Sequence, residues 1–90
     1  MPLHTTEHEF LLVLLRERRA KSGMSQVELA ERLGVTQQYV SKVEGGGQRR
    51  LDVFEFYRWC EGLGVSSREV YEEFSSTLDG RRTLRDSWDT

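Results

Sequence analysis

The sequence has little of the chemistry that crosslinks a chain, breaks helices or crosses a membrane. Its one cysteine, Cys60, excludes an intrachain disulfide, as is usual in the reducing cytoplasm. Its one proline, Pro2, leaves every later segment free to form helices. The longest apolar run, Phe10 to Leu15, has six residues, whereas about 20 are needed to span a bilayer. The N-terminus also lacks the basic region of a signal peptide. We expect a cytoplasmic protein with no membrane partner.

A strong charge of one sign is also missing. Thirteen Lys and Arg residues against 15 Asp and Glu residues give a net charge of −2, which argues against nucleic-acid binding by bulk basicity. The charge is unevenly distributed, because residues 1–50 carry +2 and residues 51–90 carry −4. The first half can therefore face an anion, and the acidic second half is a candidate surface for a protein partner. A length of 90 residues allows one domain.

Helical spacing and capping residues predict an all-α fold, a compact bundle of about five helices. Two capping boxes, Ser25 with Glu28 and Ser66 with Glu69, mark the starts of two helices. Thr36 and Asp52 are good N-cap residues for two more. Glycines end the segments, so we expect helices over about residues 6–22, 25–34, 36–44 and 52–64, and from 66 onward.

Apolar positions within these helices predict the core. On helix 52–64 and the last helix, the residues expected to face inward are Val53, Phe56, Trp59, Cys60, Leu63, Val70, Tyr71 and Phe74. Gly62 is expected to weaken the end of its helix by about 1 kcal/mol relative to Ala. In the first helix, Leu11 and Leu15 fit the core, so Phe10, Val13 or Leu14 should be partly exposed. This extra apolar face predicts either self-association or covering by the tail.

A turn signal at Asp79–Gly80 separates a C-terminal tail from the helical domain. We expect a domain over residues 1–77 and a tail over 78–90 that is either docked, through Trp88, or disordered.

The segment 36–44 has one polar face. Val40 and Val43 lie at i and i+3 and face inward, which leaves an outer face of two amides, a hydroxyl and an ammonium group. A glutamine can satisfy N7 and N6 of adenine together, and a lysine can reach guanine acceptors or a phosphate. Thr36 can contact a thymine methyl group. From these residues alone, the alternative to base reading is a polar helix face that is simply solvated. The outer residues are Gln37, Gln38, Ser41 and Lys42.

No pattern in the chain favours catalysis, a metal or a cofactor. His4 and His8 lie at i and i+4, but in an expected terminal arm with no third ligand nearby. Cys60 falls on an apolar stripe, where a thiol acts as a small hydrophobic group. The stretch EGGGQRR lacks the Lys-Ser/Thr of a phosphate-binding loop. We therefore expect no enzyme, no metal site and no cofactor.

The stretch LRERRAKSGMSQVELAERLGVTQQYVSKVEGGGQRR, followed by LDVFEFYRWCEGLGVSSREV, resembles the Cro/phage-repressor (XRE) helix-turn-helix family. The resemblance covers about Leu11 to Phe74. It implies a lambda-repressor-like domain with its helix-turn-helix at about 25–45. It also implies an ion pair between Arg19 and Glu44 that locks the third helix against the first. The implied base contacts are Thr36, Gln37, Gln38, Ser41 and Lys42, and the implied phosphate contacts are Gln26, Tyr39, Arg49 and Arg50.

These observations predict a sequence-specific regulator of transcription that binds double-stranded DNA. A short helix reads few base pairs, so we expect a homodimer with recognition helices about 34 Å apart on an inverted-repeat operator. Such a dimer would occlude polymerase and act as a repressor. The alternative is an antitoxin-like module, or a subunit of a regulatory complex, that mainly binds a protein partner through its acidic half.

Overall fold

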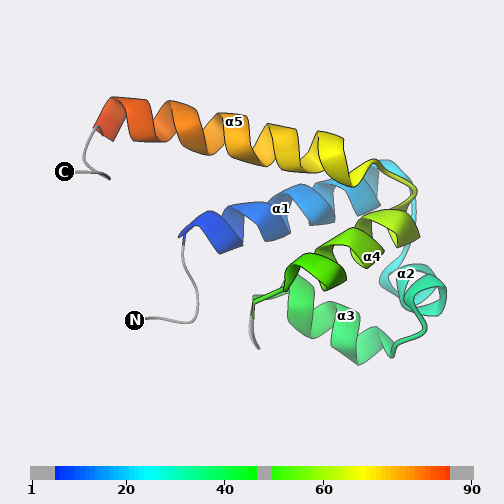
Figure 1. Ribbon diagram of the computed structural model, residues 1–90. Coiled ribbons are helices and arrows are strands. Elements are labelled where there is room, and N and C mark those ends of the chain that lie inside the picture. Colours follow the sequence, from blue (N-terminus) through cyan, green and yellow to red (C-terminus); the bar gives the residue numbers. More distant parts are fainter. Residues whose placement is uncertain (1–5, 47–49, 86–90) are drawn as a thin grey trace.

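Five helices make up almost all of the structure. The computed structural model describes residues 6–46 and 50–85, with side chains over 7–46 and 50–79. The helices are α1 (Thr6–Lys21), α2 (Gln26–Leu33), α3 (Gln37–Glu44), α4 (Val53–Leu63) and α5 (Ser67–Arg85), with no strand in the described ranges. Figure 1 shows α5 lying along α1 at the top of the molecule, α4 below them, and α2 and α3 at the lower end. The predicted all-α fold is confirmed.

Local side-chain bonds start the helices where the sequence predicts. Ser25 Oγ accepts from the Glu28 N–H at 3.0 Å, and Glu28 Oε1 accepts from the Ser25 N–H at 2.8 Å. The same reciprocal pair joins Asp52 and Glu55 at the start of α4, at 2.7 and 2.9 Å. Each box satisfies two backbone groups that a helix end otherwise leaves open, so both helices begin at defined residues.

The core lies where all five helices meet. Its largest fully buried side chains come one from each helix, in the order α1 to α5: Leu15, Leu29, Val40, Cys60 and Val70. Trp59 and Leu63 of α4 are also buried, at 3% and 4% exposure. Burial of a large aliphatic side chain stabilises the fold by roughly 1.5–3 kcal/mol. The bundle is therefore held together by contributions from every helix.

Gly62 has a packing role that the sequence did not indicate. A Cβ atom at this position would lie 3.0 Å from Leu33 Cδ2 and 3.1 Å from Leu29 Cδ1. The missing side chain thus lets α4 approach α2 closely. Arg32 of α2 also donates to the Gly62 carbonyl oxygen at 3.2 Å. The cost of Gly62 in helix propensity is therefore set against the close packing of α4 on α2.

Two residues predicted to face the core are instead exposed. Val53 is 70% exposed because it is the first residue of α4, at the edge of the bundle. Tyr71 is 57% exposed because the neighbouring Val70 takes the inward position on α5. A helix turns by about 100° per residue, so Tyr71 lies on a different side of α5 from Val70.

The apolar run of α1 is covered from within the chain. Leu14 is 3% exposed, whereas Phe10 and Val13 are half-buried. The Phe10 ring stacks on Phe74 of α5, with 6.1 Å between ring centroids. The prediction that Phe10, Val13 or Leu14 is partly exposed is therefore confirmed, by Phe10 and Val13. Within the described residues, α5 covers part of this face through the contact between Phe10 and Phe74.

The turn predicted at Asp79–Gly80 is wrong. The α5 helix continues through both residues to Arg85. A glycine inside a helix costs about 1 kcal/mol, which is not enough to end a helix already nucleated over several turns. The predicted contact of Trp88 lies outside the described residues. Within the ranges that are described, no helix has the length and apolar character of a membrane span.

Candidate nucleic-acid interface

The α2–turn–α3 unit presents one side of α3 to solvent. The turn passes through Gly34, whose φ of 73° is a left-handed conformation that glycine adopts without strain. Thr36 then caps α3 by accepting from the Tyr39 N–H at 3.1 Å. Val40 is fully buried and Val43 is 6% exposed, so the inner side of α3 is held in the core. The predicted outer residues are all exposed: Thr36, Gln37, Gln38, Ser41 and Lys42.

An ion pair anchors the end of α3 to α1. Arg19 Nε lies 2.6 Å from Glu44 Oε2, and Arg19 Nη2 lies 2.9 Å from Glu44 Oε1. Arg19 also donates to the Met24 carbonyl oxygen at 2.9 Å, and Arg16 donates to the Glu44 carbonyl oxygen at 2.8 Å. The Glu44 side chain is only 5% exposed. A two-pronged guanidinium–carboxylate contact has one preferred geometry, so it fixes the orientation of α3.

The Glu44 carboxylate orients Gln26, and Gln26 in turn orients Gln37. Glu44 Oε1 accepts from Gln26 Nε2 at 2.9 Å, and Gln26 Oε1 accepts from Gln37 Nε2 at 2.8 Å. Because a carboxylate only accepts, Gln26 must turn its NH₂ group toward Glu44 and its oxygen toward Gln37. Gln37 is therefore held with one N–H turned inward. Its carbonyl oxygen and second N–H form the acceptor–donor pair that an adenine edge requires.

This arrangement changes what is expected of Gln26. The family resemblance implies that Gln26 contacts a phosphate, but one N–H and the carbonyl oxygen of its amide are bonded within the protein. A phosphate contact from Gln26 has to use its second N–H. Because Gln26 is half-buried and bonded to both Glu44 and Gln37, it also acts as a positioning residue for Gln37.

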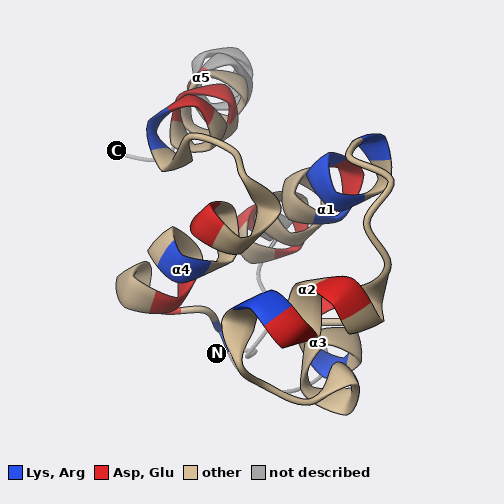
Figure 2. Ribbon diagram, turned by 90° about the vertical axis from the view of Figure 1, so that its right-hand side faces the viewer, with Lys and Arg blue, Asp and Glu red and all other residues tan. Residues whose placement is uncertain are grey.

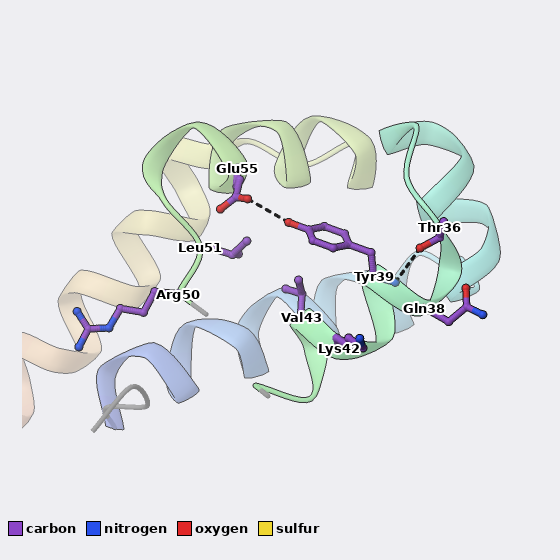
Figure 3. A pocket seen from close by; sticks show the side chains of 8 residues that line it. All are labelled: Thr36, Gln38, Tyr39, Lys42, Val43, Arg50, Leu51 and Glu55. Atoms are coloured by element: carbon purple, nitrogen blue, oxygen red, sulfur yellow. Dashed lines mark hydrogen bonds between the residues drawn. The ribbon is translucent and has the colours of Figure 1, made fainter. Parts of the chain in front are cut away.

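Tyr39 joins α3 to α4 (Figure 3). Its hydroxyl donates to Glu55 Oε2 at 3.0 Å, and its ring lies 6.1 Å from the Trp59 ring, centroid to centroid. Glu55 also belongs to the capping box at the start of α4. The predicted phosphate contact of Tyr39 therefore competes with an internal hydrogen bond. The sequence analysis predicted Asp52 as the N-cap of this helix but indicated neither the capping role of Glu55 nor its bond to Tyr39.

A hollow of about 230 Å³ lies between α3 and the start of α4. Figure 3 shows Gln38 and Lys42 on its α3 side, and Arg50 on the segment that leads into α4. Lys42 and Arg50 are both exposed, so cationic groups from two segments border one opening. The predicted contact Arg49 lies outside the described residues. The full lining is Thr36, Gln38, Tyr39, Lys42, Val43, Arg50, Leu51 and Glu55.

The two histidines do not form a site in the described part of the chain. His8 lies in α1, not in a terminal arm, and is 8% exposed. Its Nε2 accepts from the Leu51 N–H at 3.3 Å, which holds the segment before α4 against α1. His4 lies outside the described residues. Among the described residues, no three His, Cys, Asp or Glu side chains lie close enough together to hold a metal ion.

Cys60 is a packing residue. It is fully buried, and this burial raises the pKa of its thiol to about 11, although the nearby Arg18 charge acts in the opposite direction. Arg18 itself is paired with Glu73 of α5. The thiol is therefore neutral near pH 7, and it lacks the thiolate character of a nucleophile.

Known proteins are similar to this chain in both sequence and fold. The helix-turn-helix family model matches residues 15–70. An uncharacterized HTH-type transcriptional regulator y4dJ of Sinorhizobium fredii is 36% identical over 64 residues, which cover 71% of this chain and 82% of that protein. An XRE-family like protein from Pseudomonas syringae pv. tomato has a TM-score of 0.75 at 41% identity, covering 79% of this chain and 85% of the other.

Two further solved structures extend the comparison. The clp gene regulator ClgR from C. glutamicum has a TM-score of 0.71 at 29% identity, over 83% of this chain and 96% of its own. The restriction-modification controller protein C.Esp1396I has a TM-score of 0.74 at 21% identity. The match covers 83% of this chain and 96% of that protein's chain. At 21% identity, the similarity to C.Esp1396I shows a shared fold alone.

Proposed function

This chain belongs to the XRE-type helix-turn-helix family of transcriptional regulators, and we propose that it reads a DNA operator with α3. In this proposal α3 enters the major groove of an inverted-repeat site. Two copies bind together, and the bound dimer represses transcription by excluding polymerase. The target places this activity in the cytoplasm, and it involves no catalytic step and no cofactor.

The observation that carries the proposal is the orientation of Gln37. Its amide is held by Gln26, which is held in turn by the buried Glu44. A side chain whose position is fixed before binding loses less entropy when it contacts a base. Gln38, Ser41 and Lys42 extend the same exposed face, and Thr36 offers a methyl group at its start. A merely solvated helix face has no need for an oriented amide.

Phosphate contacts come from the edges of this face. Lys42 and Arg50 border the hollow beside α3, and Arg49 and Gln26 add further donors in the proposal. The net charge of −2 leaves little attraction to DNA in general. A second copy is therefore needed to supply affinity as well as a longer recognition sequence. Two α3 helices about 34 Å apart would read successive turns of the groove.

The test is selection of bound duplexes from a random pool, using the full chain. We expect the selected sequences to share two half-sites related by dyad symmetry. Binding to random duplex at low salt should also be detectable and should weaken as salt is added. The proposal fails if no duplex is bound even at low salt.

A second function is favoured by the surface of α5. Glu69, Glu72 and Glu73 are exposed on this helix next to the exposed Tyr71, and acidic residues gather there in Figure 2. A basic protein partner, as in an antitoxin-like module, fits such a surface. The two functions are compatible, and absence of DNA binding together with capture of a basic partner would leave only the second.

A further inference from the structure

The hollow beside α3 contains an acidic side chain as well as basic ones. Glu55 of α4 lines it together with Lys42 and Arg50, and Figure 3 shows the Glu55 carboxylate facing the Tyr39 hydroxyl. In the proposed function, Lys42 and Arg50 hold a DNA phosphate at this place. A carboxylate next to a phosphate is unfavourable, because like charges repel and because both anions compete for the same cations. The hollow therefore holds a group that opposes binding of the DNA backbone.

The Glu55 carboxylate is held in this position by bonds to two segments. Its Oε1 accepts from the Asp52 N–H at 2.9 Å, within the capping box of α4. Its Oε2 accepts from the Tyr39 hydroxyl at 3.0 Å. These two donors, an amide and a phenol, orient the carboxylate without cancelling its charge. Turning the carboxylate away from an approaching phosphate would break the bond that starts α4 or the bond to α3.

The same carboxylate engages the only proton that the Tyr39 side chain can donate. A phenol has one O–H, and its oxygen can otherwise only accept. A phosphate oxygen of DNA is an acceptor, so Tyr39 cannot bind it while its hydroxyl donates to Glu55. The predicted phosphate contact of Tyr39 thus requires that its bond to Glu55 be broken.

We propose that Glu55 limits the affinity of this protein for the DNA backbone. It repels a phosphate at the hollow, competes with that phosphate for Lys42 and Arg50, and retains the Tyr39 proton. This inference rests on the proposed function, and it names the side chain that restrains its phosphate contacts. Such contacts carry no sequence information. Weakening them leaves binding dependent on the base contacts of α3 and on a second copy.

The position of Glu55 gives it more influence on DNA than an acidic residue of α5 has. Glu72 is exposed on α5, which lies at the opposite end of the molecule from α3 in both Figure 1 and Figure 2. Exposed charges more than about 8–10 Å apart are largely screened at physiological salt. A carboxylate in the hollow beside α3 is close enough to a bound phosphate to act on it directly.

The first experiment measures binding of the full chain to random and selected operator duplexes by fluorescence anisotropy. Glu55→Gln should bind both duplexes about fivefold more tightly than wild type, as expected when one like charge is removed beside a phosphate in a solvated site. Glutamine can replace glutamate in a capping box, so α4 should still form, and circular dichroism checks this. Glu72→Gln is the matched control, since it changes the net charge equally, and it should alter affinity by less than about twofold.

The salt dependence separates a charge effect from a structural one. The ratio of the affinities of Glu55→Gln and wild type should fall toward one as salt is added, because ions screen the repulsion. A ratio that stays the same at every salt concentration would mean that the substitution acts through the fold, and the proposal would be overturned.

The role of the hydroxyl is tested by Tyr39→Phe in both backgrounds. The ring can still pack on Trp59, and only the O–H is lost. In wild type the hydroxyl donates to Glu55, so its removal should not weaken DNA binding. In the Glu55→Gln background the hydroxyl loses its charged acceptor and can turn to a phosphate, so its removal should weaken binding by at least about twofold. Equal effects in the two backgrounds would count against the proposal.

Failure of the proposed function gives a different result. If neither wild type nor Glu55→Gln binds any duplex at low salt, α3 does not read DNA, and the inference about Glu55 fails with the proposed function. If wild type binds duplex but Glu55→Gln binds it no more tightly than Glu72→Gln does, the proposed function stands and the role of Glu55 is refuted.

Discussion

Arg19 and Glu44 meet through two hydrogen-bonded contacts, 2.6 and 2.9 Å long, although 25 residues separate them in the sequence. The glutamate is the last residue of α3, and the arginine lies in the last turn of α1. Since Glu44 also accepts from Gln26, one buried carboxylate connects the stability of the bundle to the orientation of Gln37.

Replacing Glu44 by Ala should lower the free energy of unfolding by about 3 kcal/mol, because it leaves the Arg19 charge nearly buried without its partner. Urea unfolding followed by circular dichroism measures this loss. Arg18→Ala is the control, since its partner Glu73 is 47% exposed and such pairs contribute about 1 kcal/mol or less. Equal losses in the two variants would contradict the structural role assigned to Glu44.

Gln37→Ala should weaken binding to the selected operator by about 1–3 kcal/mol and change binding to random duplex little. The reason is that the lost amide contacts a base edge, which only the operator presents correctly. Fluorescence anisotropy with both duplexes measures the difference. Arg50→Ala should instead weaken both duplexes similarly and reduce the slope of affinity against salt. A Gln37 variant that behaves like the Arg50 variant would refute base reading.

Gln26→Ala should reduce operator preference without removing any direct base contact. Its amide holds Gln37 in place, so the Gln37 side chain becomes free to rotate and loses its fixed orientation. The double variant should then be less impaired than the sum of the single changes, by about 0.5 kcal/mol or more. A double-mutant cycle on operator binding measures this coupling. Strict additivity would mean that the bond between the two amides has no role in recognition.

Gly62→Ala should destabilise the fold even though alanine is the better helix former. The added Cβ would meet Leu33 Cδ2 at 3.0 Å and Leu29 Cδ1 at 3.1 Å, and Leu29 is fully buried. Overpacking of this kind costs about 1–3 kcal/mol, which exceeds the gain of about 1 kcal/mol in helix propensity. Thermal unfolding gives the sign. A rise in melting temperature would show that α2 and α4 can separate without cost.

Cys60 should make the protein less stable at alkaline pH. In the folded state burial raises the pKa of the thiol from 9.0 to about 11, so the unfolded chain loses this proton first as pH rises. The stabilisation is complete below pH 9 and is lost progressively through pH 11. Urea unfolding of wild type and Cys60→Ala across this range should show a shallower decline in the variant. Parallel declines would mean that the thiol titrates alike in both states.

Much of the fold follows from short-range patterns in the sequence. The capping boxes at Ser25 and Asp52 join residues three positions apart, so their geometry depends only on the local backbone. The buried stripe through Trp59, Cys60 and Leu63 follows from helical periodicity in the same way. The pair of Arg19 and Glu44 is not local, and only the resemblance to a known family indicated it.

The sequence by itself determined the all-α class, the starts of the helices and the polar outer face of α3, because each depends on residues a few positions apart. Tertiary structure alone decided that Tyr39 bonds to Glu55 and that Gln26 orients Gln37, since 16 and 11 residues separate these partners. It also decided that Gly62 permits close packing and that α5 continues past Gly80. Contacts between helices depend on how several helices pack at once, and neither periodicity nor capping encodes that arrangement.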